Sequence, residues 1–422
     1  MIALLIAGAM VVPQAQAQSQ AAAPTPEKVA EIRVHGNARM SDDMVIQLSG
    51  VSIGETIDAT GLSAIEKRLK DSGRFDEVQV RKRYRTLEMD EVALLLVVHE
   101  KPGVTENGQP PTTFRKLRSH LMFFPILYYD DGYGWTYGMR TSLVNIAGKG
   151  THFGVPLSWG ADKHAAFEAD RTFNKGPLTR AIGSFGILQR ENPFYLQDDQ
   201  RVSLKGRAER RLFDRVTLGG ELARTQVQFG TTDQIWTTTA DATLDTRRDP
   251  MYPVDAVLTG VVWTRFHAIG VTTFSASGDS VDKVTYDARG YKRLFKQNVI
   301  AARVRYDTSS GVLPPYEQPL LEGANVRSTE SGAFAGDKRL LWSAELRLPI
   351  SSPLSTGRLG FNVFYDAGAV APYGQSMSQQ TFQRGAGAGA WLIFTVIQLN
   401  LDVAHSFNGQ GTRVHFGTGF SF

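Results

Sequence analysis

Apolar and polar side chains alternate with a period of two along much of the chain after residue 118. Residues 358–366 show this pattern most clearly. Their apolar face is formed by Leu359, Phe361, Val363 and Tyr365. Their opposite face is formed by Arg358, Gly360, Asn362, Phe364 and Asp366. Such alternation predicts β-strands that turn one face to an apolar phase and the other to a polar interior, as in a membrane barrel.

The last residues of the chain continue the alternation. One face of residues 413–422 carries Val414, Phe416, Thr418, Phe420 and Phe422. The other face carries Arg413, His415, Gly417, Gly419 and Ser421. A soluble β-sandwich also alternates, but an aromatic final strand that ends at Phe422 favours a barrel in lipid. We therefore predict a last strand over 411–422.

Turn-forming clusters divide this region into short segments. Three of them are Asp130-Asp131-Gly132, Gly148-Lys149-Gly150 and Phe407-Asn408-Gly409. The region from 119 to 422 contains 304 residues. A membrane strand takes roughly 9–11 residues, so about 19 residues for a strand and its connection give about sixteen strands. We predict an all-β membrane protein with an antiparallel barrel over 119–422, whose first strand covers about 121–141.

Residues 29–102 have a different organisation, with helical as well as strand periodicity. An alternating strand from Glu31 is closed by a turn at Gly36 and Asn37. Ser41 and the two aspartates after it suit a helix start, because their oxygens satisfy free backbone N–H groups. Helical spacing then relates Leu62, Ile65 and Leu69.

Two strands follow the second helix, which ends at Gly73. The first begins at Phe75, and the second is the apolar run 92–98. The order β-α-α-β-β predicts a small α+β domain in front of the barrel. We expect residues 103–118 to link the two.

The first residues are typical of an export signal. Residues 1–12 are nearly all apolar, and Ala15-Gln16-Ala17 is a small-x-small cleavage site. The apolar run is shorter than the roughly 20 residues that a membrane helix needs. We expect a removed signal peptide over 1–17. Because the positive charge that usually begins such a signal is missing, we expect the initiator Met to lie upstream. Residues 18–28 are rich in Ala, Pro and Gln and should form a linker.

Composition narrows the chemistry that the chain can perform. It has no Cys, which removes disulfides and thiolate metal sites. Its eight His residues lack metal-ligand spacing, and it has no Gly-x-Ser-x-Gly elbow. Gly385, Gly387 and Gly389 imitate a nucleotide loop, but they lie in a predicted strand and fit small barrel-wall residues better. We expect no enzymatic activity, no metal and no cofactor.

The segment Leu321–Pro349 gives the sharpest clue to function. It reads LEGANVRSTESGAFAGDKRLLWSAELRLP, a turn-rich stretch with the pair Val326-Arg327 that leads into an alternating strand holding Glu345. The next strand holds Asp366 within Phe-Tyr-Asp-Ala-Gly. These segments resemble the inward-folded loop and following strands of the outer-membrane protein insertase superfamily, the barrel family of BamA, TamA and the two-partner-secretion translocators.

The resemblance implies a sixteen-stranded barrel whose loop enters the lumen. It assigns Val326 and Arg327 as the loop latch, with Glu345 and Asp366 as its receivers on the barrel wall. The planar guanidinium suits two carboxylates, although an ordinary lumenal ion pair is the simpler alternative. The family usually has Gly and an aromatic residue after the Arg, whereas this chain has Ser328-Thr329, and Phe334 is a candidate for the missing aromatic packing.

The N-terminal domain resembles a POTRA domain. The similarity rests on the Gly36-Asn37 turn, the 71–75 corner that contains Gly73 and Phe75, and the Glu100-Lys101-Pro102 exit. A POTRA domain implies a periplasmic position and capture of extended clients by strand addition. The simpler alternative is a scaffold that orients the barrel. The basic run 81–85 fits a solvated strand end or a contact with lipid headgroups, and we expect no nucleic-acid partner.

The resemblance implies a protein of the bacterial outer membrane that inserts or secretes polypeptides. Its partners would be outer-membrane lipids, unfolded client polypeptides and periplasmic accessory proteins. A weak seam between the first and last strands, at Gly417, Gly419, Phe420 and Phe422, would open sideways, since Gly weakens a strand. The alternatives are a passive pore and a two-partner-type secretion channel through the lumen. Lipid transport is a further option for which the sequence offers no direct argument.

Overall fold

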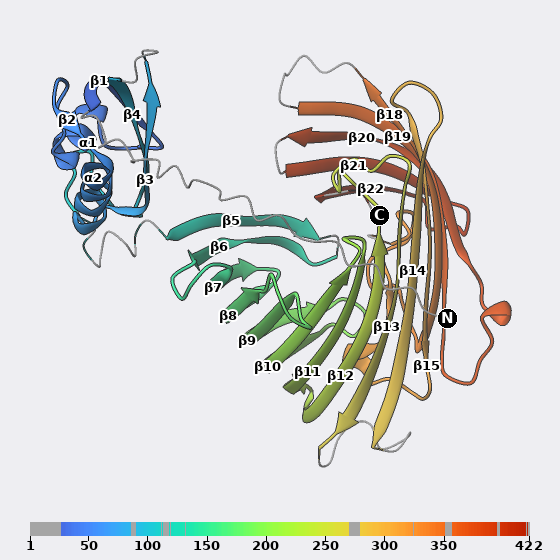
Figure 1. Cartoon of the computed structure of the whole chain (residues 1–422). Helices are drawn as coiled ribbons and strands as arrows, with labels where there is room; N and C mark the ends of the chain where they lie inside the picture. Colours follow the sequence, from blue (N-terminus) through green and yellow to red (C-terminus); the bar gives the residue numbers. More distant parts are fainter. Residues whose placement is uncertain are drawn as a thin grey trace, which may run out of the picture. The chain divides into compact units, whose positions relative to one another are not determined.

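The computed structural model separates the chain into two compact units, Met1–Ser119 and His120–Phe422 (Figure 1). It describes residues 27–85, 90–110, 112, 118, 120–130, 132–269, 279–323, 325–350, 357–394, 397–418 and 420. The predicted signal peptide, most of the predicted linker 18–28, part of the predicted linker 103–118, Gly419 and Phe422 lie outside the described residues.

The N-terminal unit is a four-stranded sheet with two helices. In chain order its elements are β1 (Glu27–His35), α1 (Asp42–Ser49), β2 (Thr56–Ile57), α2 (Ala59–Asp71), β3 (Phe75–Tyr84) and β4 (Glu91–Glu100). The strand order is β2-β1-β4-β3, and β1 runs parallel to β4. This is the predicted order with one added strand, β2, whose two residues are too few to show an alternation. No helix in the described ranges is long and apolar enough to cross a membrane.

Local sequence signals explain these elements. The Ser41 side chain accepts a hydrogen bond from the Met44 N–H and caps α1. Gly36 has a φ of 88°, and a Cβ there would lie 2.2 Å from the carbonyl oxygen of Val98, so the β1 turn requires glycine. Buried apolar side chains from both helices and the sheet form the core, with Leu69 and Phe75 among them.

The second unit is a nearly closed antiparallel barrel of sixteen strands, as predicted (Figure 1). In sheet order the first eight strands are β5 (Leu121–Asp130), β6 (Gly134–Val144), β7 (Thr151–Gly160), β8 (Lys163–Thr172), β9 (Arg180–Asn192), β10 (Gln197–Leu212), β11 (Val216–Phe229) and β12 (Thr231–Asp245). The other eight are β13 (Ala256–Ala268), β14 (Ser280–Arg293), β15 (Val299–Ser309), β18 (Lys338–Ile350), β19 (Gly357–Ala371), β20 (Gln383–Phe394), β21 (Ile397–Ser406) and β22 (Thr412–Thr418).

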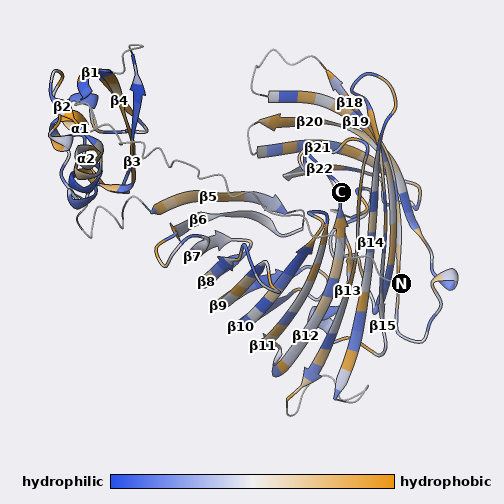
Figure 2. Cartoon of the chain, viewed as in Figure 1, coloured by the Kyte–Doolittle hydropathy of each residue, from blue (hydrophilic) through white to orange (hydrophobic). Residues whose placement is uncertain are grey.

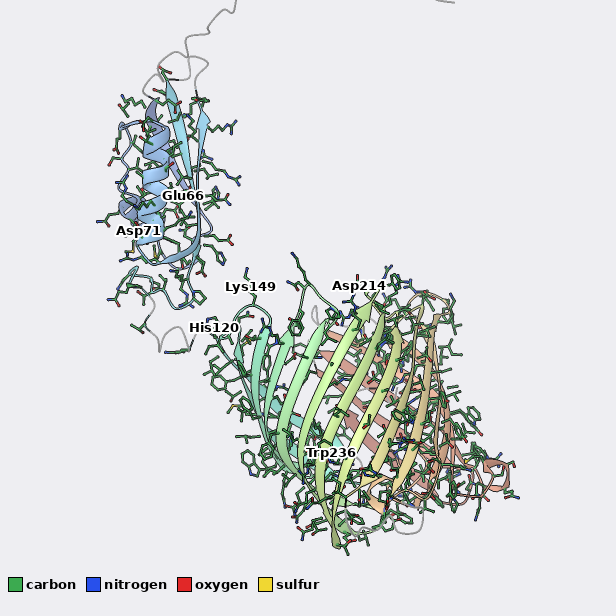
Figure 3. All side chains as sticks on the ribbon, turned by 60° about the horizontal axis from the view of Figure 1, so that its bottom comes forward. Glu66, Asp71, His120, Lys149, Asp214 and Trp236 are labelled. Carbon is green, nitrogen blue, oxygen red and sulfur yellow. The ribbon has the colours of Figure 1, made fainter. Side chains whose placement is uncertain are left out.

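His120, Lys149 and Asp214 lie at one end of the barrel (Figure 3). We name this end the His120 end and the opposite one the loop end. Strand directions alternate from β5 onward, so the long segment 310–337 between β15 and β18 starts and finishes at the loop end.

The predicted alternation of faces is present in the barrel wall. Hydrophilic and hydrophobic residues follow one another along the strands (Figure 2). In β19, Phe361 and Val363 are exposed on the outside, whereas Asn362 and Phe364 are buried on the inside. The wall therefore presents an apolar outer face and a largely polar lumen.

The predicted first strand, 121–141, is wrong in extent, because it contains β5, a turn and most of β6. The N–H of Tyr133 donates to the carbonyl of Asp130 over 3.1 Å. Gly132 and Gly134 have φ values of 86° and 101°, which an extended strand of L-residues does not adopt. The first strand of the barrel is therefore β5 alone.

The predicted outward position of Phe420 is also wrong. Strand β22 ends at Thr418, and the period of two does not continue to Phe420. The ring of Phe420 lies inside the barrel, with its centroid 5.5 Å from Trp391 and 6.5 Å from Tyr252. The guanidinium of Arg347 lies 3.8 Å from its centroid, so a buried aromatic and cationic environment attracts this ring away from the outer face.

Candidate functional site

The segment 310–337 folds into the lumen. It contains a 3-10 turn (Pro315–Glu317). It also contains two strands of two residues each, β16 (Leu320–Leu321) and β17 (Phe334–Ala335), which pair antiparallel. Its residues 326–329 are almost completely buried. We call this segment the lumenal loop.

Arg327 of the lumenal loop is held by three carboxylates. Its Nε and Nη2 donate to the two oxygens of Asp366 over 2.8 and 3.0 Å. Its Nη1 donates to Glu345 over 2.8 Å and to Asp402 over 3.3 Å. The backbone N–H of Arg327 also donates to Asp366, over 3.2 Å. The structure thus brings together the predicted latch residue and both predicted receivers.

Asp402 on β21 is a third receiver that the sequence prediction missed. Asn362 and Asn400 each donate to its carboxylate over 3.0 Å, which fixes its position. The signal was present in the sequence, because Leu399, Leu401 and Val403 alternate with Asn400 and Asp402. This alternation places Asp402 on the face of the strand that points into the lumen.

The charges of this site are shielded from solvent. The side chains of Arg327, Glu345, Asp366 and Asp402 are at most 3% exposed. A second guanidinium, that of Arg347, donates from Nε to Glu345 over 2.8 Å. Burial opposes the charged form of Arg327, but the attraction of Asp366 and Glu345 outweighs it and raises the pKa of Arg327 above its usual value. The loop therefore stays charged and paired.

The aromatic ring that packs on Arg327 comes from the barrel wall and not from the loop. The Cζ of Arg327 lies 3.3 Å from the ring centroid of Phe364 on β19, a cation–π contact that desolvation strengthens. Phe334 packs instead on a small apolar cluster of Leu321, Val326 and Leu341. Val326 therefore anchors the loop by packing and Arg327 anchors it by charge, while Ser328 and Thr329 are buried beside them.

Three glycines of β20 leave room for the loop and for the wall residues that hold it. A Cβ on Gly385 would lie 2.3 Å from Ser328, and one on Gly387 would lie 2.5 Å from the ring of Phe364. A Cβ on Gly389 would lie 1.9 Å from the carboxylate of Asp402. These small wall residues therefore shape the space in which the lumenal loop docks.

The two ends of the barrel sheet meet at a seam. Within the described ranges no strand pairing joins β5 to β22. The ring of Phe416 contacts Tyr129 and Trp135, with centroid distances of 5.9 and 5.7 Å. Of the predicted seam residues, Gly417 faces Asn400 across the neighbouring strand β21, and Phe420 lies in the lumen.

The predicted POTRA turn residues all belong to the framework of the N-terminal unit. Asn37 donates to the carbonyl of Met40 over 2.8 Å, and Gly73 follows α2 with a φ of 71°. Phe75 is in the core. In the part of the chain that the structure describes, no group of acidic and His side chains is arranged to hold a metal ion.

The fold and the docked loop define an outer-membrane β-barrel preceded by one POTRA unit. Residues 145–422 match the Omp85 superfamily domain, and residues 27–101 match the POTRA family described as a surface antigen variable number repeat. The chain belongs to the Omp85 superfamily. It is a bacterial outer-membrane protein, and this membership supports a role in inserting or secreting polypeptides.

Two solved structures illustrate the likeness. BamA from Haemophilus ducreyi lacking POTRA domains 1–3 is 14% identical, with a TM-score of 0.62, and the match covers 93% of this chain and 84% of that one. CdiB from Escherichia coli is 11% identical, with a TM-score of 0.52, and the match covers 97% and 92%. At these identities the likeness shows the fold. No curated protein sequence matches the chain significantly.

Proposed function

We propose that this protein inserts polypeptides into the outer membrane, with its POTRA unit in the periplasm and its lumenal loop as a latched internal element. The observation that carries the proposal is the docking of Arg327 on Glu345, Asp366 and Asp402. Removing several charges from water is costly, and an apolar plug of similar volume would often be at least as stable. A charged latch in place of an apolar plug therefore favours a specific working arrangement over simple filling of the lumen.

The POTRA unit has a place for an extended client. Among the described residues, its sheet has unpaired edges at β2 and β3. A hollow of about 410 Å³ lies beside β2 and is lined by Ile57, Ile65 and Arg68 among others. A client strand added to β2 would gain main-chain hydrogen bonds from the edge, and its side chains would meet a hollow whose lining also includes Glu55 and Asp58. These features support client capture at β2.

The seam supports lateral opening. The described contacts across it include those of Phe416 with Tyr129 and Trp135. Such contacts cost less to separate than a continuous ladder of hydrogen bonds. An open edge of β5 or β22 would then pair with a client strand.

Engineered cysteines test this route, and the chain has no native Cys to interfere. Tyr129→Cys combined with Phe416→Cys places two thiols across the seam. Oxidation should stop assembly of a client barrel, and reduction should restore it. Unchanged assembly after complete cross-linking would rule out lateral opening.

Secretion through the lumen is the second candidate, since membership of the Omp85 superfamily supports secretion as well as insertion. This route needs the lumenal loop to leave Arg327's receivers, whereas lateral insertion does not. Glu330→Cys with Arg413→Cys, joined by a short bifunctional thiol reagent, would fix the loop to β22, since the two native side chains form an ion pair at 3.2 Å. A fixed loop should block secretion and spare insertion. In both cases the protein acts by moving polypeptides, without catalysis or a cofactor.

A further inference from the structure

The His120 end of the barrel carries a cluster of exposed cations on β8 to β11. Arg171 lies near the end of β8, and Arg210 lies near the end of β10. Lys175 follows in the β8–β9 turn, and Arg215 follows in the β10–β11 turn. Asp214, which precedes Arg215, marks this end of the barrel in Figure 3. We call the four cations the basic rim.

Strand register puts the two strand cations on the outer face of the wall. Arg210 lies opposite Leu218, an exposed apolar residue of β11. Arg171 lies opposite Ala181 of β9. Ala181 in turn lies opposite Ala208, two residues before Arg210 on β10. Residues opposite one another share a face, and so do residues two apart on one strand, so both arginines lie on the lipid-facing side.

The basic rim has little compensating negative charge. Among the described residues, none of its four cations has a carboxylate partner. The nearby carboxylates of Asp170 and Glu209 lie on the lumenal face, where Arg180 approaches them at 2.6 and 3.7 Å. Asp214 is the one acidic residue in the two turns, 173–179 and 213–215. The outer side of this end therefore carries a net positive charge.

Apolar side chains accompany these cations. The Cζ of Arg171 lies 5.4 Å from the ring centroid of Phe173, the first residue of the β8–β9 turn. Arg210 donates to the carbonyl of Gly176 in the same turn, so the two guanidinium groups converge there. Leu178 of this turn is exposed as well. Apolar groups beside cations at strand ends suit a lipid–water interface, where the cations reach out to the headgroups.

The wall next to the basic rim is low, because small residues form it. Gly183 of β9 lies opposite Gly206 of β10, and a Cβ on either would meet no other heavy atom within 4 Å. Two residues further from the rim, the exposed side chains of Phe185 and Leu204 lie opposite one another. A shallow depression thus runs between these larger apolar side chains and the cations.

We propose that the basic rim and this depression bind an anionic phospholipid. An acyl chain covers Gly183 and Gly206, and the phosphate contacts Arg171 and Arg210, whose planar guanidinium groups suit phosphate oxygens. An acidic protein segment would satisfy the cations, but the depression continues into the apolar outer face that lipid covers. With the POTRA unit in the periplasm, as proposed above, this is the periplasmic leaflet, because the chain enters the barrel at this end.

Native mass spectrometry of the full chain tests the class of ligand. The protein is released from detergent that contains equimolar phosphatidylglycerol and phosphatidylcholine with identical acyl chains. We expect selective retention of phosphatidylglycerol, because only this lipid has a net negative headgroup. Equal retention of both lipids would overturn the proposal and would favour an acidic protein segment as the partner.

A soluble headgroup separates the lipid from free phosphate. Glycerol 3-phosphate has the phosphate but no acyl chain, so at the concentration of the lipid it should not displace phosphatidylglycerol. Displacement at that concentration would mean that the cations bind phosphate alone and that the depression has no part in binding.

Two double variants locate the lipid. Arg171→Gln with Arg210→Gln should weaken retention of phosphatidylglycerol roughly 25-fold, or roughly fivefold for each cation. The matched control, Lys163→Gln with Arg224→Gln, removes the same charge from exposed residues of β8 and β11 toward the loop end and should change little. Each variant is first checked for a folded, heat-modifiable barrel. Equal weakening in both variants would show attraction by net charge alone and would refute the site.

Discussion

Arg327 combines features that a surface ion pair lacks. It donates to Asp366 with two nitrogens, it lies over the ring of Phe364, and it is shielded from solvent. Surface pairs contribute little, but removing one member of a buried network leaves uncompensated charges. The position of the lumenal loop therefore depends strongly on this one side chain.

Replacing Arg327 tests that dependence. Arg327→Ala leaves three buried carboxylates without their shared cation, which should cost about 3–5 kcal/mol. Arg327→Lys should rescue poorly, because an ammonium lacks the planar fork. The readout is the temperature at which the barrel loses its compact migration on an SDS gel. The control is Arg413→Ala, which removes an exposed pair with Glu330 and should change little. An Arg327→Ala barrel as heat-resistant as the native one would disprove the assignment.

Glu322, in the same loop, should make loop docking sensitive to pH. Burial, followed by the negative charge of Asp130, raises the pKa of Glu322 above its ordinary value of 4.5. Because the pKa of Glu322 is raised when the loop is docked, the docked loop is most stable below pH 4.5, where Glu322 is protonated in both states. The docked loop loses this stability as the pH rises through the folded-state pKa. Protease protection of the loop should therefore decrease from acidic to neutral pH.

The variant Glu322→Gln supplies the comparison. It keeps an acceptor for the Asn325 side chain, which donates to Glu322 over 3.2 Å, but it cannot ionise. Protection of its loop should be greater at neutral pH and should vary less with pH. An identical pH profile in both proteins would show that Glu322 has no part in the effect.

At the scale of elements, the sequence predicted what periodicity encodes and missed what tertiary contacts decide. Alternation located the strands and put Asp366 and Phe364 in the lumen. It did not reveal β2, which has two residues, or the hairpin of β16 and β17. The inward turn of Phe420 depends on Arg347 and Trp391, which are distant in sequence. The meeting of Arg327 with three separate strands likewise needed the family resemblance or the structure.

Strand β20 should control the fit of the loop through its glycines. Gly389→Ala brings a methyl group against Asp402 and should cost about 1–3 kcal/mol through overpacking. Loop cleavage by added protease should increase. Ala388→Val, on the outer face of the same strand opposite Val363, is the control and should have no such effect. Equal cleavage in the two variants would mean that the glycine row is not needed for docking.

The end of β22 should be held inward by Phe420. Phe420→Ala removes its contacts with Arg347, Trp391 and Tyr252 and should release the chain end from the lumen. Hydrogen exchange at β22 should become faster by at least several-fold. Val414→Ala, at an exposed outer position on the same strand, is the control. Unchanged exchange in Phe420→Ala would show that backbone pairing to β21 alone holds this end.

At the scale of the whole molecule, three features combine into one proposed machine. The POTRA unit offers a client edge at β2, the lumenal loop is latched by charge, and the barrel sheet has a seam without strand pairing among its described residues. A passive pore does not require these three features to occur together. The proposed function therefore requires that the purified protein change the fate of a polypeptide.

The most direct measurement is assembly of an unfolded outer-membrane barrel in liposomes that contain the purified protein. The folded fraction is read over time as heat-modifiable, protease-resistant client. A barrel that inserts polypeptides should give faster client assembly than empty liposomes. The gain should be lost in oxidised Tyr129→Cys/Phe416→Cys protein and regained on reduction. Client assembly at the rate seen in empty liposomes, with a correctly folded native barrel present, would contradict the proposed function.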